Sequence, residues 1–163
     1  VYNLNKELNM IGKNIEKMFK EPTENIMIPA SDVAIVHEED SLVHAILVLS
    51  SSGYQTIPVL DKDNRVRGLI SISNIVTNSD DLSIFDEDRL AEFKVKQVMN
   101  QVVPILFDNY NLEDVLRLII NNNFICVTHK NGYFLGIIPR KIILERFTNI
   151  AHNLENQYTL TEK

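Results

Sequence analysis

Residues 53–76 read GYQTIPVLDKDNRVRGLISISNIV, and residues 123–144 repeat the same pattern as NFICVTHKNGYFLGIIPRKIIL. Each copy has a short apolar strand, a polar turn, a second strand with a glycine followed by two aliphatic residues, and then an amphipathic helix. When the copies are aligned, Gly68 falls on Gly136. Two similar units that pack against each other leave a cleft between them, and such clefts are frequent sites for small ligands.

The sequence before each copy adds one strand and one helix, so each repeat has the order β-α-β-β-α and the fold class is α/β, of the α+β kind. In the first repeat we predict strands at 33–36, 57–60 and 66–70, a helix at 42–49 and a helix after residue 71. In the second repeat we predict strands at 102–106, 124–127 and 133–138, and helices at 112–120 and 140–147. Ser41 and Asn111 are expected to cap helix starts, and Gly53 is expected to end a helix.

The chain divides into five segments. They are an N-terminal amphipathic helix at 1–22, the first repeat at 23–79, an acidic linker at 80–92, the second repeat at 93–149, and a flexible polar tail at 150–163. The N-terminal helix belongs to neither repeat. It is expected either to cover the core of its own chain or to contact a second copy or another partner.

Composition narrows the classes of function. The 163 residues carry a net charge of −6 and contain no dense basic patch, which argues against a nucleic-acid partner. The single cysteine, Cys126, excludes an intramolecular disulfide and fits a reducing compartment. No apolar stretch approaches 18 residues and the start does not resemble a signal peptide, so we expect a cytoplasmic protein without a membrane segment.

Order and spacing together resemble a pair of CBS domains, also called a Bateman module, over residues 26–149. The resemblance rests on the strand sequence from Tyr54 to Asp61, on the Gly-Leu-Ile-Ser return that begins at Gly68, and on the two-fold repeat. It implies that the repeats pack through their sheets with pseudo-two-fold symmetry. It also implies that adenine nucleotides bind in the clefts between the repeats and that two modules pair.

A narrower resemblance is to the stand-alone cyclic-di-AMP-binding CBS proteins of Gram-positive bacteria, the CbpB/DarB type. The matching segments are 26–28, 33–34, 53–61, 120–127, 136–137 and 140–141. The resemblance implies a cytosolic homodimer that binds cyclic di-AMP, needs no cofactor and regulates other proteins, such as the enzyme that makes and degrades the stringent-response alarmone. Lys141 stands where this group commonly has an arginine, and lysine loses the planar bidentate fork.

CBS domains that bind mononucleotides usually share the sequence motif Gly-x-x-Thr-x-x-Asp, here called the frame. The resemblance implies that its Thr and Asp bind the ribose. Here the first frame has Ser71 and Asn74 at those positions, and the second has Pro139 and Ile142. A 3′,5′-cyclic dinucleotide has one free ribose hydroxyl per nucleoside. Losing the side chains that bind both ribose hydroxyls therefore lowers its affinity less than it lowers the affinity for AMP or ATP. The frames therefore favour a cyclic dinucleotide, with AMP, ADP or ATP as the alternative ligand.

The first repeat also has two extra residues, Gln55 and Thr56, before its strand. With the aromatic ring of Tyr54 and the apolar Ile57 they supply an apolar slot and a few polar atoms, which an adenine pocket needs. The second repeat offers Phe124 and Cys126 instead. We therefore predict that each chain has one cleft able to bind the ligand, and that the first repeat forms the base of this cleft.

The remaining candidate site residues are two cations and one short segment. Arg140 and Lys141 begin the last predicted helix, where they favour a phosphodiester. Asp32, Val33 and Ala34 are expected to bond the base edge through their backbone. The Asp32 carboxylate is unfavourable beside an anion, so it is expected to face solvent or to pair with Lys141.

The sequence contains no arrangement typical of an enzyme. It has no phosphate-binding glycine-rich loop, nucleophile elbow or Cys/His/Asp set, and its four histidines lack metal-ligand spacing. We therefore expect neither catalytic nor metal-binding residues. A structural dimer with empty clefts is the remaining alternative to a nucleotide sensor.

Overall fold

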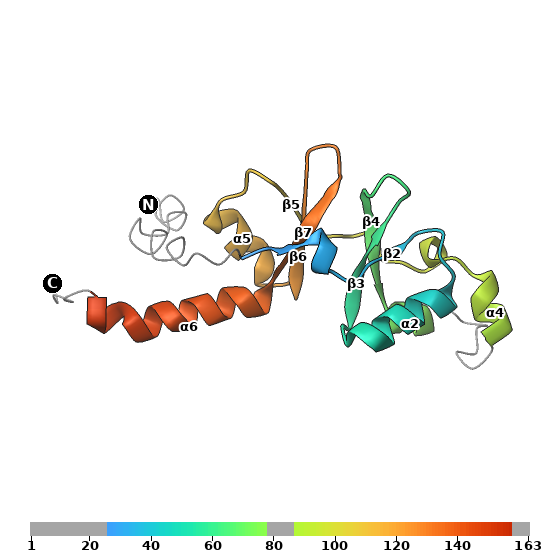
Figure 1. Ribbon diagram of the computed structural model, residues 1–163, viewed down its shortest axis with the longest axis horizontal. Helices are drawn as coiled ribbons and strands as arrows, with labels where there is room; N and C mark the ends of the chain where they lie inside the picture. The colour runs from blue at the N-terminus through green and yellow to red at the C-terminus, as the bar shows by residue number, and fades with distance from the viewer. Residues whose placement is uncertain (1–25, 78–86, 158–163) are drawn as a thin grey trace, which may run out of the picture.

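The computed structural model describes residues 26–77 and 87–157. The predicted N-terminal helix, 1–22, lies outside the described residues, as do 78–86 and 158–163. Two small sheets stand side by side, and their hairpins point in the same direction (Figure 1). No helix within the described ranges is both long enough and apolar enough to cross a membrane.

The first repeat is built on the three-stranded sheet β2-β3-β4. Its elements are β2 (Val36–His37), α2 (Leu42–Ser52), β3 (Thr56–Leu60), β4 (Val66–Ser71) and α3 (Ile72–Thr77). Ser41 caps α2 by accepting a hydrogen bond from the His44 amide at 3.2 Å, and Gly53 ends it with φ 71°, as predicted.

The second repeat is built on the four-stranded sheet β1-β7-β6-β5. Its elements are β5 (Ile105–Phe107), α5 (Leu112–Ile119), β6 (Phe124–Thr128), β7 (Phe134–Pro139) and α6 (Arg140–Gln157). Asn111 caps α5, since its side chain accepts from the Asp114 amide at 2.9 Å while the Asp114 carboxylate accepts from the Asn111 amide at 3.2 Å. The β-α-β-β-α order predicted for both repeats is confirmed.

The two repeats exchange their leading segments, which the sequence did not predict. The strand β1 (Ile28–Pro29) precedes the first repeat but pairs antiparallel with β7 of the second. The segment that leads into β5 of the second repeat returns the exchange, because Asn100 and Leu69 of β4 exchange two backbone hydrogen bonds of 2.8 Å. The second repeat's sheet therefore gains a strand, and the first repeat's sheet gains an isolated bridge, from the segment that leads into the other repeat's sheet.

Within the described residues, this arrangement gives three apolar cores. One fills the first repeat around Ile70 and a second fills the second repeat around Ile138. A third lies between the repeats, where Leu60 packs with Cys126, Phe134 and Ile137. At the hairpin tips two backbone hydrogen bonds join the sheets, from Val66 N to Gly132 O at 3.1 Å and from Phe134 N to Asn64 O at 2.9 Å.

Two predicted strands lie later in the chain than expected. The strand predicted at 33–36 is observed at Val36–His37, because Ala30–Asp32 forms a 3-10 turn (η1) and the Val33 and Ile35 side chains pack between the repeats. The strand predicted at 102–106 is observed at Ile105–Phe107. In both places an apolar run indicated burial correctly but not the residues that pair.

The predicted linker and tail were also wrong in part. Within the acidic stretch 80–92, α4 (Glu87–Glu92) is a helix whose Leu90 packs into the core of the first repeat with 4% of its surface exposed. It leads into a 3-10 turn, η2 (Val95–Gln97). The last helix was predicted to end near 147, with a flexible tail from 150, but α6 continues to Gln157, and Ile150 within it packs into the core of the second repeat.

Candidate functional site

A cavity of about 280 Å³ lies between the two repeats, at the ends of β3, β6 and β7 that are opposite the joined hairpin tips. The first repeat lines it with Val33, Ala34, Gly53, Tyr54, Gln55, Thr56, Ile57 and Pro58. The second repeat lines it with Asn123, Phe124, Ile137 and Pro139. Most of the wall is apolar, so the cavity suits a flat, largely apolar group such as a purine base.

The first repeat shapes the cavity through the turn that follows α2. Gly53 adopts the left-handed conformation that ends the helix, and the Tyr54 amide then donates to the Ser52 hydroxyl at 3.4 Å. After this turn Tyr54 is 49% exposed, whereas Ile57, three residues later, is buried. The two extra residues of this loop therefore lie at the cavity, as the sequence predicted.

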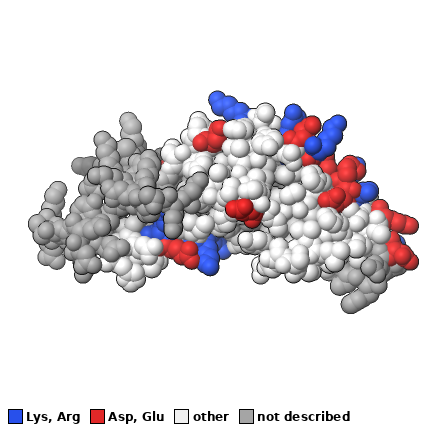
Figure 2. All heavy atoms as spheres, viewed as in Figure 1, with Lys and Arg blue, Asp and Glu red and all other residues white. Residues whose placement is uncertain are grey.

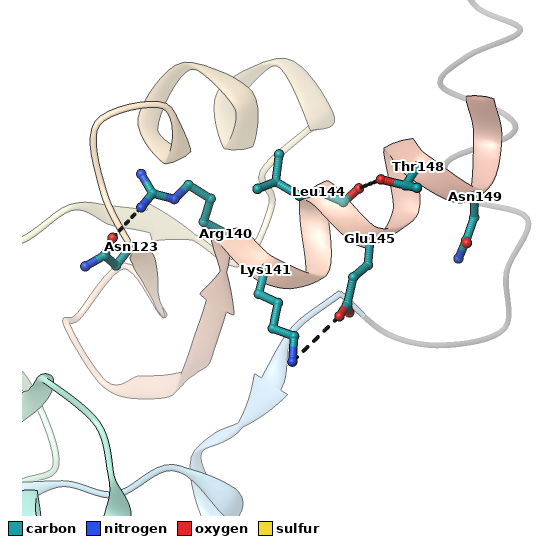
Figure 3. Close-up of a pocket in the computed structure, with 7 residues that line it drawn as sticks. All are labelled: Asn123, Arg140, Lys141, Leu144, Glu145, Thr148 and Asn149. Atoms are coloured by element: carbon teal, nitrogen blue, oxygen red, sulfur yellow. Dashed lines mark hydrogen bonds and ion pairs between the residues drawn. The ribbon is translucent and has the colours of Figure 1, made fainter. Parts of the chain in front are cut away.

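Asn123 and Arg140 hold the second repeat's side of the site. The Asn123 carbonyl accepts from the Arg140 amide at 2.8 Å, and the Asn123 side-chain oxygen accepts from Arg140 Nη2 at 2.6 Å (Figure 3). Because Asn123 lines the cavity, these bonds hold the guanidinium at its rim. Arg140 uses one nitrogen on Asn123, and a guanidinium has five N–H donors in all.

A second hollow adjoins the cavity at Asn123 and runs along α6. We call it the α6 groove; it measures about 740 Å³ and is lined by Asn123, Arg140, Lys141, Leu144, Glu145, Thr148 and Asn149. Figure 3 shows Lys141 and Glu145 pointing to the same side of the helix, and their charged ends lie 3.7 Å apart. This pair is exposed, so its attraction is weak and an anion can compete for Lys141.

The structure brings most of the predicted site residues together. Val33, Ala34, Tyr54, Gln55, Thr56 and Ile57 line the cavity, and Arg140 and Lys141 line the adjoining groove. Asp32 lines neither hollow; its carboxylate accepts a hydrogen bond from the Ser31 hydroxyl at 3.0 Å. The alternative pairing of Asp32 with Lys141 is not observed, since Lys141 pairs with Glu145.

Sequence reasoning missed the lining that the second repeat supplies. Phe124 was taken as the second repeat's counterpart of Tyr54, and Asn123, Ile137 and Pro139 were not assigned to the site. The signal for Pro139 was present in the second Gly-x-x-Thr-x-x-Asp frame, where it occupies the Thr position. The arrangement of the repeats was needed to show that this frame faces the cavity.

The position of the two frames sharpens the argument about ribose. Pro139 lines the cavity, so no hydroxyl is present at that frame position. The other frame lies outside the cavity lining, where the Ser71 hydroxyl donates to Asn74 Oδ1 at 2.7 Å and accepts from the Asn74 amide at 3.1 Å. Neither frame therefore supplies the cavity with a side chain that could bind both ribose hydroxyls.

The charges around the site favour an anionic ligand on the second repeat. Acidic side chains, with some Lys and Arg among them, gather toward the end of the molecule that carries α4, and near the start of α6 Lys and Arg side chains stand on either side of an acidic one (Figure 2). Burial raises the pKa of the Cys126 thiol to about 12, so the thiol stays protonated near neutral pH. Because the thiolate is the nucleophilic form, we interpret Cys126 as a residue of the packed core. No group of three or more His, Cys, Asp or Glu within the described ranges could hold a metal ion.

Comparison with known proteins identifies the family. The model of the CBS domain family matches residues 24–81 and 95–149, which together make up most of the chain. The chain belongs to the CBS domain family. The bounds of the two matches fall close to those of the two structural repeats, so each repeat is one CBS domain.

Individual relatives point to one group of CBS proteins. Cyclic di-AMP receptor B of Bacillus subtilis is 32% identical over 145 residues, which cover 89% of this chain and 99% of the relative. The crystal structure of CbpB from Streptococcus agalactiae superposes with a TM-score of 0.82 at 28% identity, covering 94% and 96% of the two chains. CbpB of Listeria monocytogenes in complex with c-di-AMP gives 0.69 at 36% identity, covering 77% and 94%.

Proposed function

We propose that this CBS protein is a non-enzymatic cytosolic receptor for cyclic di-AMP, which binds in the cavity between the repeats and alters the protein's contacts with other proteins. The observation that carries the proposal is the combination at one cavity of an apolar purine slot, a proline where a ribose-binding hydroxyl would stand, and Arg140 at the rim. Relatives named as a cyclic di-AMP receptor and as CbpB bound to c-di-AMP support the choice of ligand.

Each part of the ligand has a counterpart in the site. One adenine lies between Tyr54, Ile57 and Ile137, and the polar atoms of Gln55 and Thr56 form hydrogen bonds with its edge. A phosphodiester lies against the free donors of Arg140, and Lys141 adds a second positive charge. Asp32 takes no part, because it lies outside both hollows.

Regulation requires a partner whose binding is coupled to the ligand. The proposed form is a homodimer, and the proposed partner is a cytosolic enzyme such as the synthetase and hydrolase of the stringent-response alarmone. By linkage, ligand and partner change each other's affinity by the same factor. A pull-down that captures equal amounts of such an enzyme with and without ligand would contradict this coupling.

A mononucleotide is the second candidate, and the size of the cavity favours it. A volume of about 280 Å³ suits one nucleotide, and AMP, ADP and ATP each contain only one nucleoside. Against it stand the missing ribose readers. Thermal unfolding with each nucleotide separates the two, since a ligand at 100 times its Kd adds about 2.7 kcal/mol to the free energy of unfolding. A larger increase with ATP than with cyclic di-AMP would reverse the assignment.

Arg140→Ala tests the proposed site directly. Removing a charged hydrogen-bond donor is expected to weaken cyclic di-AMP binding by about 10- to 150-fold, which corresponds to about 1.5–3 kcal/mol. Isothermal titration calorimetry measures this affinity. Arg117→Ala is the matched control, because Arg117 is exposed on α5 and lines neither hollow. Equal affinities for Arg140→Ala and the control would remove Arg140 from the site.

A further inference from the structure

The cavity is too small for the whole of the proposed ligand. Pockets that enclose drug-sized molecules span about 300–1,000 Å³, and this one measures about 280 Å³. Cyclic di-AMP contains two adenosines joined by two phosphodiesters, so it has about twice the bulk of a mononucleotide. If one adenosine occupies the cavity, the other must lie outside it.

The α6 groove is the place that the structure offers for the second adenosine. The two hollows share Asn123, and Arg140 lies at their boundary through its hydrogen bond to Asn123. A macrocycle whose phosphodiester contacts Arg140 therefore has one nucleoside on each side of this residue. The groove of about 740 Å³ has room for a nucleoside.

Building on the proposed function, we infer that cyclic di-AMP spans both hollows and that its second adenine lies on Leu144 in the α6 groove. Leu144 is the apolar member of a lining that is otherwise polar or charged, and 58% of its surface is exposed. It follows Arg140 by one helical turn, so it lies on the same side of α6. An exposed leucine beside a cation matches a base attached to a phosphodiester.

The neighbouring side chains complete this arrangement. The Thr148 hydroxyl donates its proton to the Leu144 carbonyl at 2.9 Å, which leaves its oxygen to accept from the amino group of adenine. Glu145 opposes the anionic part of the ligand, and the Lys141 ammonium can turn from Glu145 to the phosphodiester because their exposed pairing is weak.

The two candidate ligands differ in length. AMP fits within the cavity and does not reach Leu144, whereas cyclic di-AMP contacts both hollows. Leu144 is thus a specificity-determining residue for the dinucleotide. A change at Leu144 is expected to affect one ligand and leave the other unchanged, which a loss of folding would not do.

Calorimetric titration of Leu144→Ala and Leu144→Glu with cyclic di-AMP and with AMP tests this. We expect about 5-fold weaker cyclic di-AMP binding for Leu144→Ala, from the loss of apolar contact, and at least about 10-fold weaker binding for Leu144→Glu, which adds a carboxylate near the phosphodiesters. AMP affinity should stay at the wild-type value. Leu47→Ala is the control, since Leu47 is 61% exposed on α2 and lines neither hollow.

Unchanged cyclic di-AMP binding by both variants, with normal binding by the wild type, would overturn the inference and leave the proposed function standing. An equal loss for AMP would also overturn it, because Leu144 would then act on the cavity itself. If the wild type binds no cyclic di-AMP, the proposed function fails and the inference fails with it.

Discussion

Gly68 and Gly136 stand at the two places where a segment from before one repeat crosses the sheet of the other. A Cβ atom built at Gly136 would overlap the Ile28 carbonyl oxygen of β1. One built at Gly68 would lie 2.8 Å from the Met99 sulfur and 2.9 Å from the Asn100 carbonyl oxygen. The two carbonyl oxygens are backbone atoms, so they cannot move aside as a flexible side chain does. The glycine shared by the two copies of the repeat is therefore explained by the exchange of segments.

Gly136→Ala is expected to lower the free energy of unfolding by about 3 kcal/mol or more, because β1 must shift to admit the new methyl group. Gly53→Ala is the matched control: its φ of 71° disfavours alanine, but no atom lies within 4 Å of the new methyl group. That change should cost about 1–2 kcal/mol. Urea unfolding of both variants measures the difference, and similar losses would show that the approach of β1 is not tight.

The residues of the site were predictable where they depend on local sequence. The loop from Tyr54 to Ile57 was found because two extra residues lengthen it, and Arg140 because it begins a helix. Asn123 and Pro139 were not found, because their role depends on which faces of the two repeats meet. Asp32 is exposed, as one of its two expected alternatives had it, but it lines neither hollow, and the 3-10 turn at Ala30–Asp32 that places it there is not visible as a pattern of apolar residues.

At the scale of elements, α6 differs most from its prediction. Polar residues after Phe147 indicated a frayed end, yet the helix runs to Gln157 and extends well beyond the sheet of its repeat (Figure 1). Ile150 explains why the helix continues past Phe147, since it lies two turns after Ile143 and both are buried in the core of the second repeat. A single apolar contact at helical spacing therefore outweighed the polar composition of the surrounding residues.

Ile150→Ala is expected to lower the free energy of unfolding by about 2 kcal/mol, because Ile150 is only 8% exposed and its loss leaves a gap between α6 and the core. Leu47→Ala, on the exposed face of α2, should change stability by less than about 0.5 kcal/mol. Thermal or urea unfolding compares the two. If Ile150→Ala were as mild as Leu47→Ala, the tail would be loosely attached, as the sequence first indicated.

At the scale of the molecule, the tandem repeat followed from the sequence, because the two copies share order and spacing, and the expectation that the repeats pack against each other came from the resemblance to CBS domain pairs. The exchange of leading segments did not follow from the sequence, since Ile28–Pro29 is too short to give a strand pattern of its own. The exchange makes the folding of each repeat depend on the other. Each repeat lacks a sheet partner without the other half of the chain, and the third core is shared between them.

The isolated second repeat, residues 93–157, is therefore expected not to fold. It lacks β1 beside β7, and it exposes Cys126, Phe134 and Ile137, which are buried against the first repeat in the whole chain. Circular dichroism with urea titration should give no cooperative transition for this fragment. The full chain should unfold in one transition with the same midpoint by fluorescence and by circular dichroism.

A second fragment separates the two causes of this instability. Joining residues 26–31 through a flexible linker to the start of 93–157 restores β1 but leaves the face of the third core exposed. If the missing strand is the main cause, this fusion regains a cooperative transition; if the shared core is the main cause, it stays unfolded. A cooperative transition in the unmodified fragment would contradict the mutual dependence of the repeats. The ligand cavity would then lie between two independently stable units, and binding would have to order their contact.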